Sequence, residues 1–148
     1  MPTIMISGAI RQYDKGTTFE SIVKEYQPKY NYSIALVYFN GKMRELSKRL
    51  ERDGALSFIT TADSAGHNAY VRTAQMMLVK AASEILGETG KTPHVKIEFS
   101  LGNACFCSLL GGIRSTPDLA ARLEERMHSY VERNIPIIKK TYPIDDAI

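Results

Sequence analysis

The chain has 148 residues, a length that suits one ordinary domain or two small ones. Its content of 44% hydrophobic and 24% charged residues is typical of a folded globular protein and excludes a disordered chain. The formal net charge of +3 permits a nucleic-acid partner, but it falls short of the dense basic field that would argue for one by itself.

Neither membrane insertion nor a disulfide framework is expected. The sequence has no run of about 18 apolar residues, the length that a transmembrane helix needs. Residues 1–12 also lack the charged start and apolar core of a secretory signal. The two cysteines are Cys105 and Cys107, and a bridge between residues two apart on an extended strand is strained. We therefore expect reduced thiols in a cytoplasmic protein with no membrane partner.

Short β-rich stretches and turn signals organise the first part of the chain. Ser7-Gly8 and Asn40-Gly41 are predicted hairpin turns, since these residue types tolerate a positive φ. Thr17 or Thr18 is expected to cap a helix. The expected elements are strands at 3–6, 9–13, 33–39 and 55–60, a helix running to 26, and a helical or turn-like passage at 46–50. This β-β-α-β-β order, with a last strand returning to the centre, predicts a β-grasp arrangement.

A long amphipathic helix is predicted over residues 63–86, after an Asp-Ser-Ala-Gly turn. Gly87 is expected to act as its C-terminal cap. Apolar side chains recur along it at near-helical spacing. They are Tyr70, Val71, Ala74, Met77, Leu78, Ala81 and Ile85.

A hairpin and a second helix are predicted to follow. Strands at 94–100 and 104–109 are joined by Gly102-Asn103, with the alternation placing Phe99 on the buried face and Glu98 with Ser100 on the other. Pro117 suits the first position of a helix running to residue 134, and residues 135–140 are expected to return as a strand. The inner stripe of this helix is Leu119, Leu123, Met127, Tyr130 and Val131.

Residues 1–62 resemble the TGS domain, a small ubiquitin-like β-grasp module named partly for threonyl-tRNA synthetase. The order and spacing of several short elements carry this resemblance. They are Gly16-Thr17-Thr18, Ala35-Leu36-Val37, Asn40-Gly41-Lys42, Leu46, Leu50, Gly54 and Phe58-Ile59-Thr60.

Residues 63–148 resemble the second amino-terminal, editing domain of threonyl-tRNA synthetase, which makes the expected fold α+β throughout. In that family an Arg-His-Ser-x-x-His run supplies two histidines. Here Arg72 matches the arginine, while Thr73 and Met77 stand at the histidine positions and cannot replace an imidazole as a metal ligand or proton shuttle. The family's later Cys and His would fall beyond Ile148. The resemblance therefore predicts the scaffold without its editing chemistry.

The same region also resembles bacterial nucleoside kinases of the uridine kinase type, in which both domains precede a P-loop kinase domain. Asp63, Gly66, Tyr70-Val71-Arg72 and Phe106-Cys107 carry this match. The resemblance implies a non-catalytic regulatory or ligand-binding region. Its parent would phosphorylate uridine or cytidine from ATP or GTP with magnesium. The implied partners are the downstream kinase domain, a nucleotide and further copies of the chain.

Arg72 is the strongest candidate for a binding residue, because a guanidinium on the first part of a helix can hold an anion through its fork of donors. The alternative is a structural salt bridge to Asp63 or Glu98. A surviving synthetase-like cleft would give a candidate ligand site lined by Tyr70, Arg72, Thr73, Glu98, Ser100 and Cys107.

Catalytic and metal motifs are not found. Gly90-Lys91-Thr92 ends like a phosphate-binding loop, but Ile85 stands where the upstream glycine is required. His67, His94 and His128 lack metal-ligand spacing, and a site of Cys105, Cys107 and His128 is disfavoured because free cysteines are common core residues. We therefore expect no catalytic residue, metal or cofactor in this chain.

Two further functions remain open from the sequence. A free-standing tRNA- or RNA-binding module is the main alternative to the kinase reading. Its basic residues would be Arg122, Arg126, Arg133, Lys139 and Lys140, although neighbouring glutamates dilute that helix. A tRNA deacylase is disfavoured, since no general base replaces the missing histidines.

Overall fold

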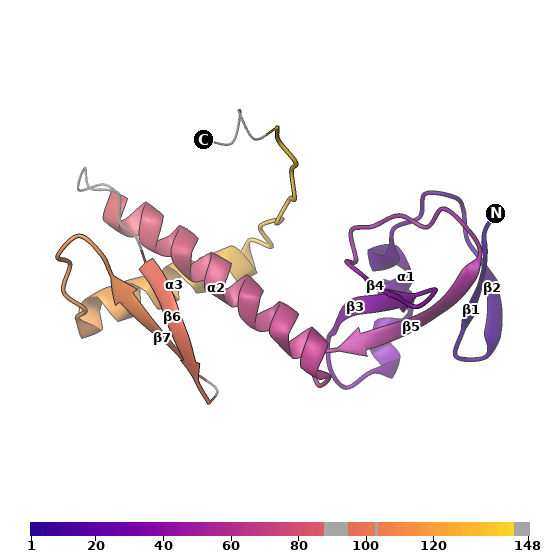
Figure 1. Ribbon diagram of the computed structural model, residues 1–148, viewed down its shortest axis with the longest axis horizontal. Coiled ribbons are helices and arrows are strands. Elements are labelled where there is room, and N and C mark those ends of the chain that lie inside the picture. Colours follow the sequence, from indigo (N-terminus) through magenta and orange to yellow (C-terminus); the bar gives the residue numbers. More distant parts are fainter. Residues whose placement is uncertain (88–94, 103, 144–148) are drawn as a thin grey trace. The chain divides into compact units, whose positions relative to one another are not determined.

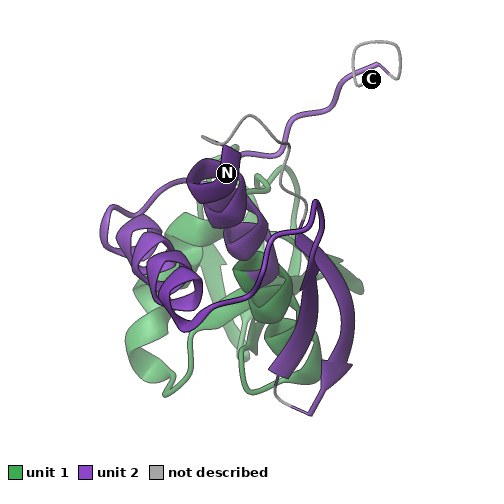
Figure 2. Cartoon of the chain, turned by 90° about the vertical axis from the view of Figure 1, so that its left-hand side faces the viewer, with its two compact units in different colours: residues 1–74 green, residues 75–148 purple. Residues whose placement is uncertain are grey.

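A computed structural model describes residues 1–87, 95–102 and 104–143 of the chain (Figure 1). It forms two compact units, residues 1–74 and residues 75–148, which Figure 2 colours separately and which are described one at a time. The boundary between these units falls inside a long helix. The domain boundary predicted from the sequence, after residue 62, is a different division of the chain and stays a prediction.

Unit 1 is built on a five-stranded mixed sheet. In the order β2-β1-β5-β3-β4, the last strand lies in the centre, parallel to β1 and antiparallel to β3. This is the central return that the β-grasp prediction requires. The elements are β1 Thr3–Ile6, β2 Ala9–Gln12, α1 Phe19–Tyr26, a 3₁₀ turn Gln27–Lys29, β3 Ile34–Phe39, β4 Lys42–Arg44 and β5 Gly54–Thr60.

Both predicted hairpin turns are confirmed by the backbone. Ser7 and Gly8 have φ of 50° and 81°, and Asn40 and Gly41 have φ of 48° and 75°. The Asn40 side chain also accepts from the Ala55 N–H at 2.9 Å and donates to the Asp53 carbonyl at 3.0 Å, which ties the β3–β4 turn to the start of β5. The turn residues thus set both the hairpin and its register against the central strand.

The core of unit 1 lies between α1 and the sheet. The Thr18 hydroxyl caps α1 by accepting a hydrogen bond from the Ser21 N–H. Of the two residues predicted as possible caps, Thr17 and Thr18, the second takes the role. Phe19 and Phe39 contact each other with ring centroids 5.3 Å apart. The other buried members are Ile4, Ile6, Ile22, Val23, Ile34, Val37, Leu50 and Leu56. The apolar face of α1, formed by Phe19, Ile22 and Val23, is therefore the face that packs on the sheet.

Helix α2 spans Ser64–Leu86 and begins at a tightly connected junction. The Asp63 carboxylate accepts from the Thr60 N–H at 2.7 Å and from its hydroxyl at 2.9 Å. A Cβ on Gly66 would overlap the Thr60 carbonyl group. Helix α2 ends at Leu86, directly before Gly87, which has an ordinary φ; the predicted capping role of Gly87 stays a prediction, because the residues that follow it lie outside the described ranges.

Unit 2 contains the second half of α2, a hairpin and a final helix. Strands β6 Val95–Leu101 and β7 Ala104–Leu109 pair antiparallel, and α3 covers Pro117–Glu132 with Thr116 as its N-cap. The core holds Ala82, Ile85, Leu86 and Leu119, with Val95, Leu109, Ile113 and Leu123 packed against it. The predicted hairpin and the predicted helix starting at Pro117 are present, while His94, Asn103 and the Gly90-Lys91-Thr92 segment lie outside the described residues.

Two predictions for the end of unit 2 are wrong. Val131 is 65% exposed and does not belong to the inner stripe of α3. Residues 135–140 form no strand: Pro136 has no N–H to donate, and Ile137 and Ile138 are both exposed. Apolar composition alone suggested a strand there, although β6 and β7 form a sheet of two strands without it.

None of the helices within the described residues combines the length and apolarity needed to span a bilayer.

Candidate functional site

The six residues of the predicted ligand cleft are divided between the two units. Tyr70, Arg72 and Thr73 lie on the first half of α2 in unit 1. Glu98 and Ser100 lie on β6, and Cys107 lies on β7, all in unit 2. Because each unit is described by itself, a single cleft that uses all six residues stays a prediction.

The three α2 residues present an exposed surface. Tyr70 is 63% exposed, so it does not belong to a buried face of the helix as its spacing predicted. The Thr73 hydroxyl donates to the Ala69 carbonyl at 2.9 Å, which satisfies its donor within the helix. Arg72 is also exposed. The group available for binding on this part of α2 is therefore the exposed Arg72 guanidinium.

Asp63, in the same unit as Arg72, does not take the suggested role of its structural partner, and a salt bridge from Arg72 to Glu98, which lies in the other unit, stays a prediction. The two bonds from Thr60 occupy the Asp63 carboxylate and lower its pKa. Glu98 bonds to Lys96 at 2.8 Å and to the Ser108 hydroxyl at 2.8 Å, and these bonds lower the pKa of Glu98. Within the described ranges, Arg72 forms no ion pair, which leaves its charge available to a ligand.

Glu98 and Ser100 lie on opposite faces of the hairpin, contrary to the prediction that they share one. A β-bulge between Ile97 and Phe99 inserts Glu98 as an extra residue, so that Ile97 pairs with Cys107 but Phe99 pairs with Phe106. Glu98 therefore bonds to Ser108, while Ser100 faces its pairing partner Cys105, with the hydroxyl oxygen 3.9 Å from the sulfur.

The bulge also exposes Phe99, which the sequence prediction placed inside, and stacks it on Phe106. Phe99 and Phe106 are 53% and 51% exposed and stack with centroids 5.1 Å apart and 15° between planes. Leu101, next on the same face, is 63% exposed. Strict alternation predicted a buried Phe99, and no local signal in the sequence marks the inserted residue.

The two thiols lie on the other face of the hairpin and are free. Gln75 donates from Nε2 to the Cys105 sulfur at 3.0 Å. Burial raises the pKa of the Cys107 thiol, and the neighbouring Cys105 raises it further. Among the described residues no group of three or more His, Cys, Asp or Glu side chains could hold a metal ion. His128, the third ligand considered from sequence, instead lies 3.8 Å from Glu124 on α3.

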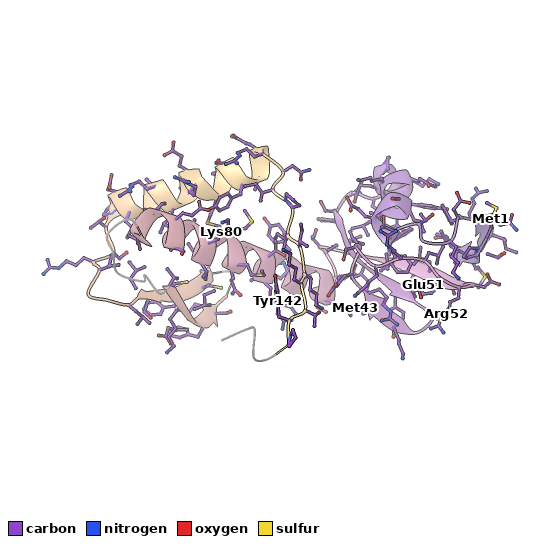
Figure 3. All side chains as sticks on the ribbon, turned by 90° about the horizontal axis from the view of Figure 1, so that it is seen from above. Met1, Met43, Glu51, Arg52, Lys80 and Tyr142 are labelled. Carbon is purple, nitrogen blue, oxygen red and sulfur yellow. The ribbon has the colours of Figure 1, made fainter. Side chains whose placement is uncertain are left out.

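A cluster centred on Glu84 was missed by the sequence analysis. Its carboxylate contacts Lys80 at 2.7 Å, Arg126 at 3.1 Å and the Tyr130 hydroxyl at 2.7 Å (Figure 3 labels Lys80 on α2). These partners lower the pKa of Glu84 to about 2, and burial with the bond to Glu84 raises the pKa of Tyr130 to about 12. Arg126 therefore serves the packing of unit 2 and is removed from the predicted RNA-binding face.

Unit 1 carries a cationic cavity that the sequence analysis also missed. It is open to solvent, has a volume of about 340 Å³ and has Phe19 and Phe39 among its lining. Its other lining residues are charged: Arg44, Lys48, Arg49, Glu51 and Arg52. Figure 3 labels Glu51 and Arg52, which follow one another on the β4–β5 connection. The available signal was the density of basic residues over 44–52, which alternates with carboxylates and therefore resembles an ordinary solvated loop.

The chain is similar to threonine–tRNA ligases over nearly its whole length. It is 28% identical to the Rhodospirillum rubrum enzyme over 141 residues, covering 95% of this chain and 21% of that protein. It is 26% identical to the Granulibacter bethesdensis enzyme over 149 aligned positions, covering 100% of this chain and 23% of that protein. With threonine–tRNA ligase 1 of Bacillus subtilis the identity is 24% over 144 positions, covering 95% and 21%.

The chain thus spans about a fifth of the length of the curated relatives it matches. No family model matches it. The resemblance to the synthetase that the sequence indicated is supported, and the α+β fold agrees with it. The uridine kinase resemblance finds no support among the relatives named above.

Proposed function

We propose that this chain is an RNA-binding module for tRNA, related to a region of threonine–tRNA ligases. The observation that carries the proposal is the similarity over at least 95% of the chain to proteins named as ligases of threonine and tRNA. Because the chain corresponds to only about a fifth of such a protein, we propose that it binds the RNA and takes no part in the ligation reaction.

The residues favour binding over hydrolysis of a mischarged tRNA. Thr73 and Met77 occupy the positions at which the resembling family has paired histidines, and the Thr73 hydroxyl is already bonded to its own helix. Neither side chain can act as a general base near neutral pH. The deacylase reading therefore lacks the group that its chemistry needs.

Exposed guanidinium groups supply candidate phosphate contacts. Arg72 on α2, Arg122 on α3 and Arg133 directly after α3 are exposed, whereas Arg126 is paired with Glu84. Such contacts would hold the backbone of an RNA without reading its sequence. A tRNA ligand also agrees with the predicted cytoplasmic location and reduced thiols.

The test is RNA affinity at several salt concentrations. Labelled total tRNA is titrated with the 148-residue chain between about 50 and 200 mM salt, with a DNA duplex of similar length as the control. If the chain is a tRNA-binding module, it should bind tRNA more tightly than the duplex. The logarithm of the binding constant for tRNA should also fall linearly with the logarithm of the salt concentration, with a slope of several units. Absence of tRNA binding at the lowest salt would contradict the proposal.

The nucleoside-kinase reading stays a prediction that rests on Asp63, Gly66, Tyr70-Val71-Arg72 and Phe106-Cys107. Under it, the chain would regulate a kinase domain that uses ATP or GTP with magnesium. The gene sequence beyond the codon for Ile148 decides this reading. A Gly-x-x-x-x-Gly-Lys-Ser/Thr loop following a strand there would support a kinase.

A further inference from the structure

Most residues that line the cationic cavity of unit 1 lie on the β4–β5 connection, whose backbone is fixed by hydrogen bonds to the start of α1. The β4–β5 connection is bound to the start of α1 by hydrogen bonds from Glu20 N–H to the Leu46 carbonyl at 2.8 Å and from Phe19 N–H to the Lys48 carbonyl at 3.0 Å. Leu50 is fully buried, and its N–H donates to the Thr17 carbonyl at 2.8 Å. The basic side chains of this connection therefore project from a fixed frame.

These bonds also decide what kind of ligand contact the cavity offers. Amide groups at a helix start often bind anions, but those of Phe19 and Glu20 are taken by carbonyls of the connection. Recognition must therefore come from side chains. Arg44 is half-buried, whereas Lys48 and Arg52 are exposed. Arg49 uses one donor on the Gly16 carbonyl at 3.1 Å, which leaves its remaining N–H groups for a ligand.

The positive charge of the whole chain is concentrated at this cavity. Its lining holds four cations against one carboxylate, Glu51. The full chain has 19 Lys and Arg against 16 Asp and Glu, so 15 of each remain outside the lining. In the part of the chain that the structure describes, none of the four cations forms an ion pair. Nearby Asp53 instead accepts from the Thr3 N–H at 2.8 Å.

We propose that this cavity binds a phosphate group, held by Arg44, Lys48 and Arg52, with Arg49 positioned by Gly16. Guanidinium forks match phosphate oxygens, and several unpaired cations around one concave site are costly to keep together unless an anion joins them. The volume of about 340 Å³ suits a group of nucleotide size. The ring faces of Phe19 and Phe39 are buried in the core and do not offer a stacking platform.

An RNA backbone and a free nucleotide are two sources of the same phosphate chemistry. The first source deepens the proposed tRNA function, since it would place some of the RNA contacts on unit 1. The second does not depend on that function. The experiment must therefore use both kinds of ligand on the same variants.

The experiment follows backbone amide signals of residues 16–20 and 44–52 in the full chain by NMR during titration. The probes are inorganic phosphate, ATP and a single-stranded RNA of 12 nucleotides. Arg44→Gln and Arg52→Gln remove a lining cation each, and Arg11→Gln, at an exposed position on β2 outside the lining, is the matched control. Arg49 is left intact because its bond to Gly16 belongs to the frame. Lys48→Gln, at an exposed position, replaces Arg44→Gln if that variant unfolds.

We expect shifts confined to these segments and an affinity about tenfold lower in each cavity variant, the size of one hydrogen bond to a charged group. For RNA, the salt slope should also fall by about one unit. Arg11→Gln should leave binding of all three probes by the cavity unchanged. Binding of ATP without binding of the RNA would support the cavity as a site for a free nucleotide, and the tRNA titration described above would then decide the tRNA function separately.

Two results would overturn the cavity inference. If RNA binds but Arg44→Gln and Arg52→Gln bind every probe as the parent chain does, the cavity is excluded while the tRNA function survives. If none of the three probes moves the signals of residues 16–20 and 44–52, the cavity does not bind phosphate.

Discussion

The Tyr130 hydroxyl on α3 donates a 2.7 Å hydrogen bond to Glu84 Oε2 on α2. Tyr130 is only 5% exposed, whereas about a third of the Glu84 side chain remains in contact with solvent. The two residues are 46 positions apart in sequence. The bond therefore holds α3 against the second half of α2 in unit 2.

Removing this hydroxyl is expected to destabilise unit 2. Tyr130→Phe should lower the free energy of unfolding by about 1 kcal/mol, the low end for a bond to a charged acceptor that is partly solvated. Tyr142→Phe, at a residue 57% exposed, is the control and should change nothing. Urea unfolding followed by circular dichroism measures both. Equal stabilities of the two variants would show that the bond contributes nothing.

The same cluster predicts a pH dependence in acid. The pKa of Glu84 is lowered from 4.5 to about 2, first by its bond to Lys80 and then by that to Tyr130. A folded-state pKa below the unfolded value means stability that is present above pH 4.5 and is lost as the pH falls toward 2. Glu84→Gln should therefore be less stable than the parent chain at pH 6, and this difference should nearly vanish at pH 2. A constant difference over that range would contradict the assignment.

Two glycines, one in the first turn of α2 and one directly after its last residue, should respond oppositely to alanine. Gly66→Ala places a Cβ against the Thr60 carbonyl group, which no side-chain rotation can relieve, so we expect a loss of about 2 kcal/mol or more. Gly87→Ala meets open space at an ordinary φ and should be neutral or stabilising by about 0.5 kcal/mol. Thermal unfolding of both variants tests the pair, and similar melting temperatures would disprove the close approach.

Cys107 should react slowly with alkylating reagents. Burial raises its pKa, so less thiolate is present near neutral pH, and the thiolate is the reactive form. In the Cys105→Ser variant we expect Cys107 to react more slowly than free cysteine at pH 7.5, because burial is the larger of its two causes. The rate should rise as the pH increases. A rate equal to that of free cysteine at neutral pH would show an accessible thiol.

Arg72 is predicted to serve binding and not folding. Because it is exposed and has no ion pair among the described residues, Arg72→Gln should leave the melting temperature unchanged. The proposed tRNA function predicts weaker tRNA binding and a salt slope reduced by about one unit. Arg126→Gln is the matched contrast, since it breaks the contact with Glu84 and should lower stability. An unchanged salt slope in Arg72→Gln would remove Arg72 from the candidate site.

The amino-acid sequence by itself determined the local features of this protein. The turns at Ser7-Gly8 and Asn40-Gly41, the Thr18 cap and the helix start at Pro117 could be predicted because each depends on residues within a few positions of one another. The helices followed from apolar spacing for the same reason. The synthetase resemblance also came from short motifs in order along the chain.

Only the tertiary structure decided which side chains meet. The bulge at Glu98 moved Phe99 outward and separated Glu98 from Ser100, because one inserted residue reverses the faces of a strand and leaves no mark in the local pattern. The Glu84–Tyr130 bond and the cationic cavity beneath the β4–β5 connection join residues from separate elements. Their energies depend on distance and burial, which a spacing rule along the chain does not contain.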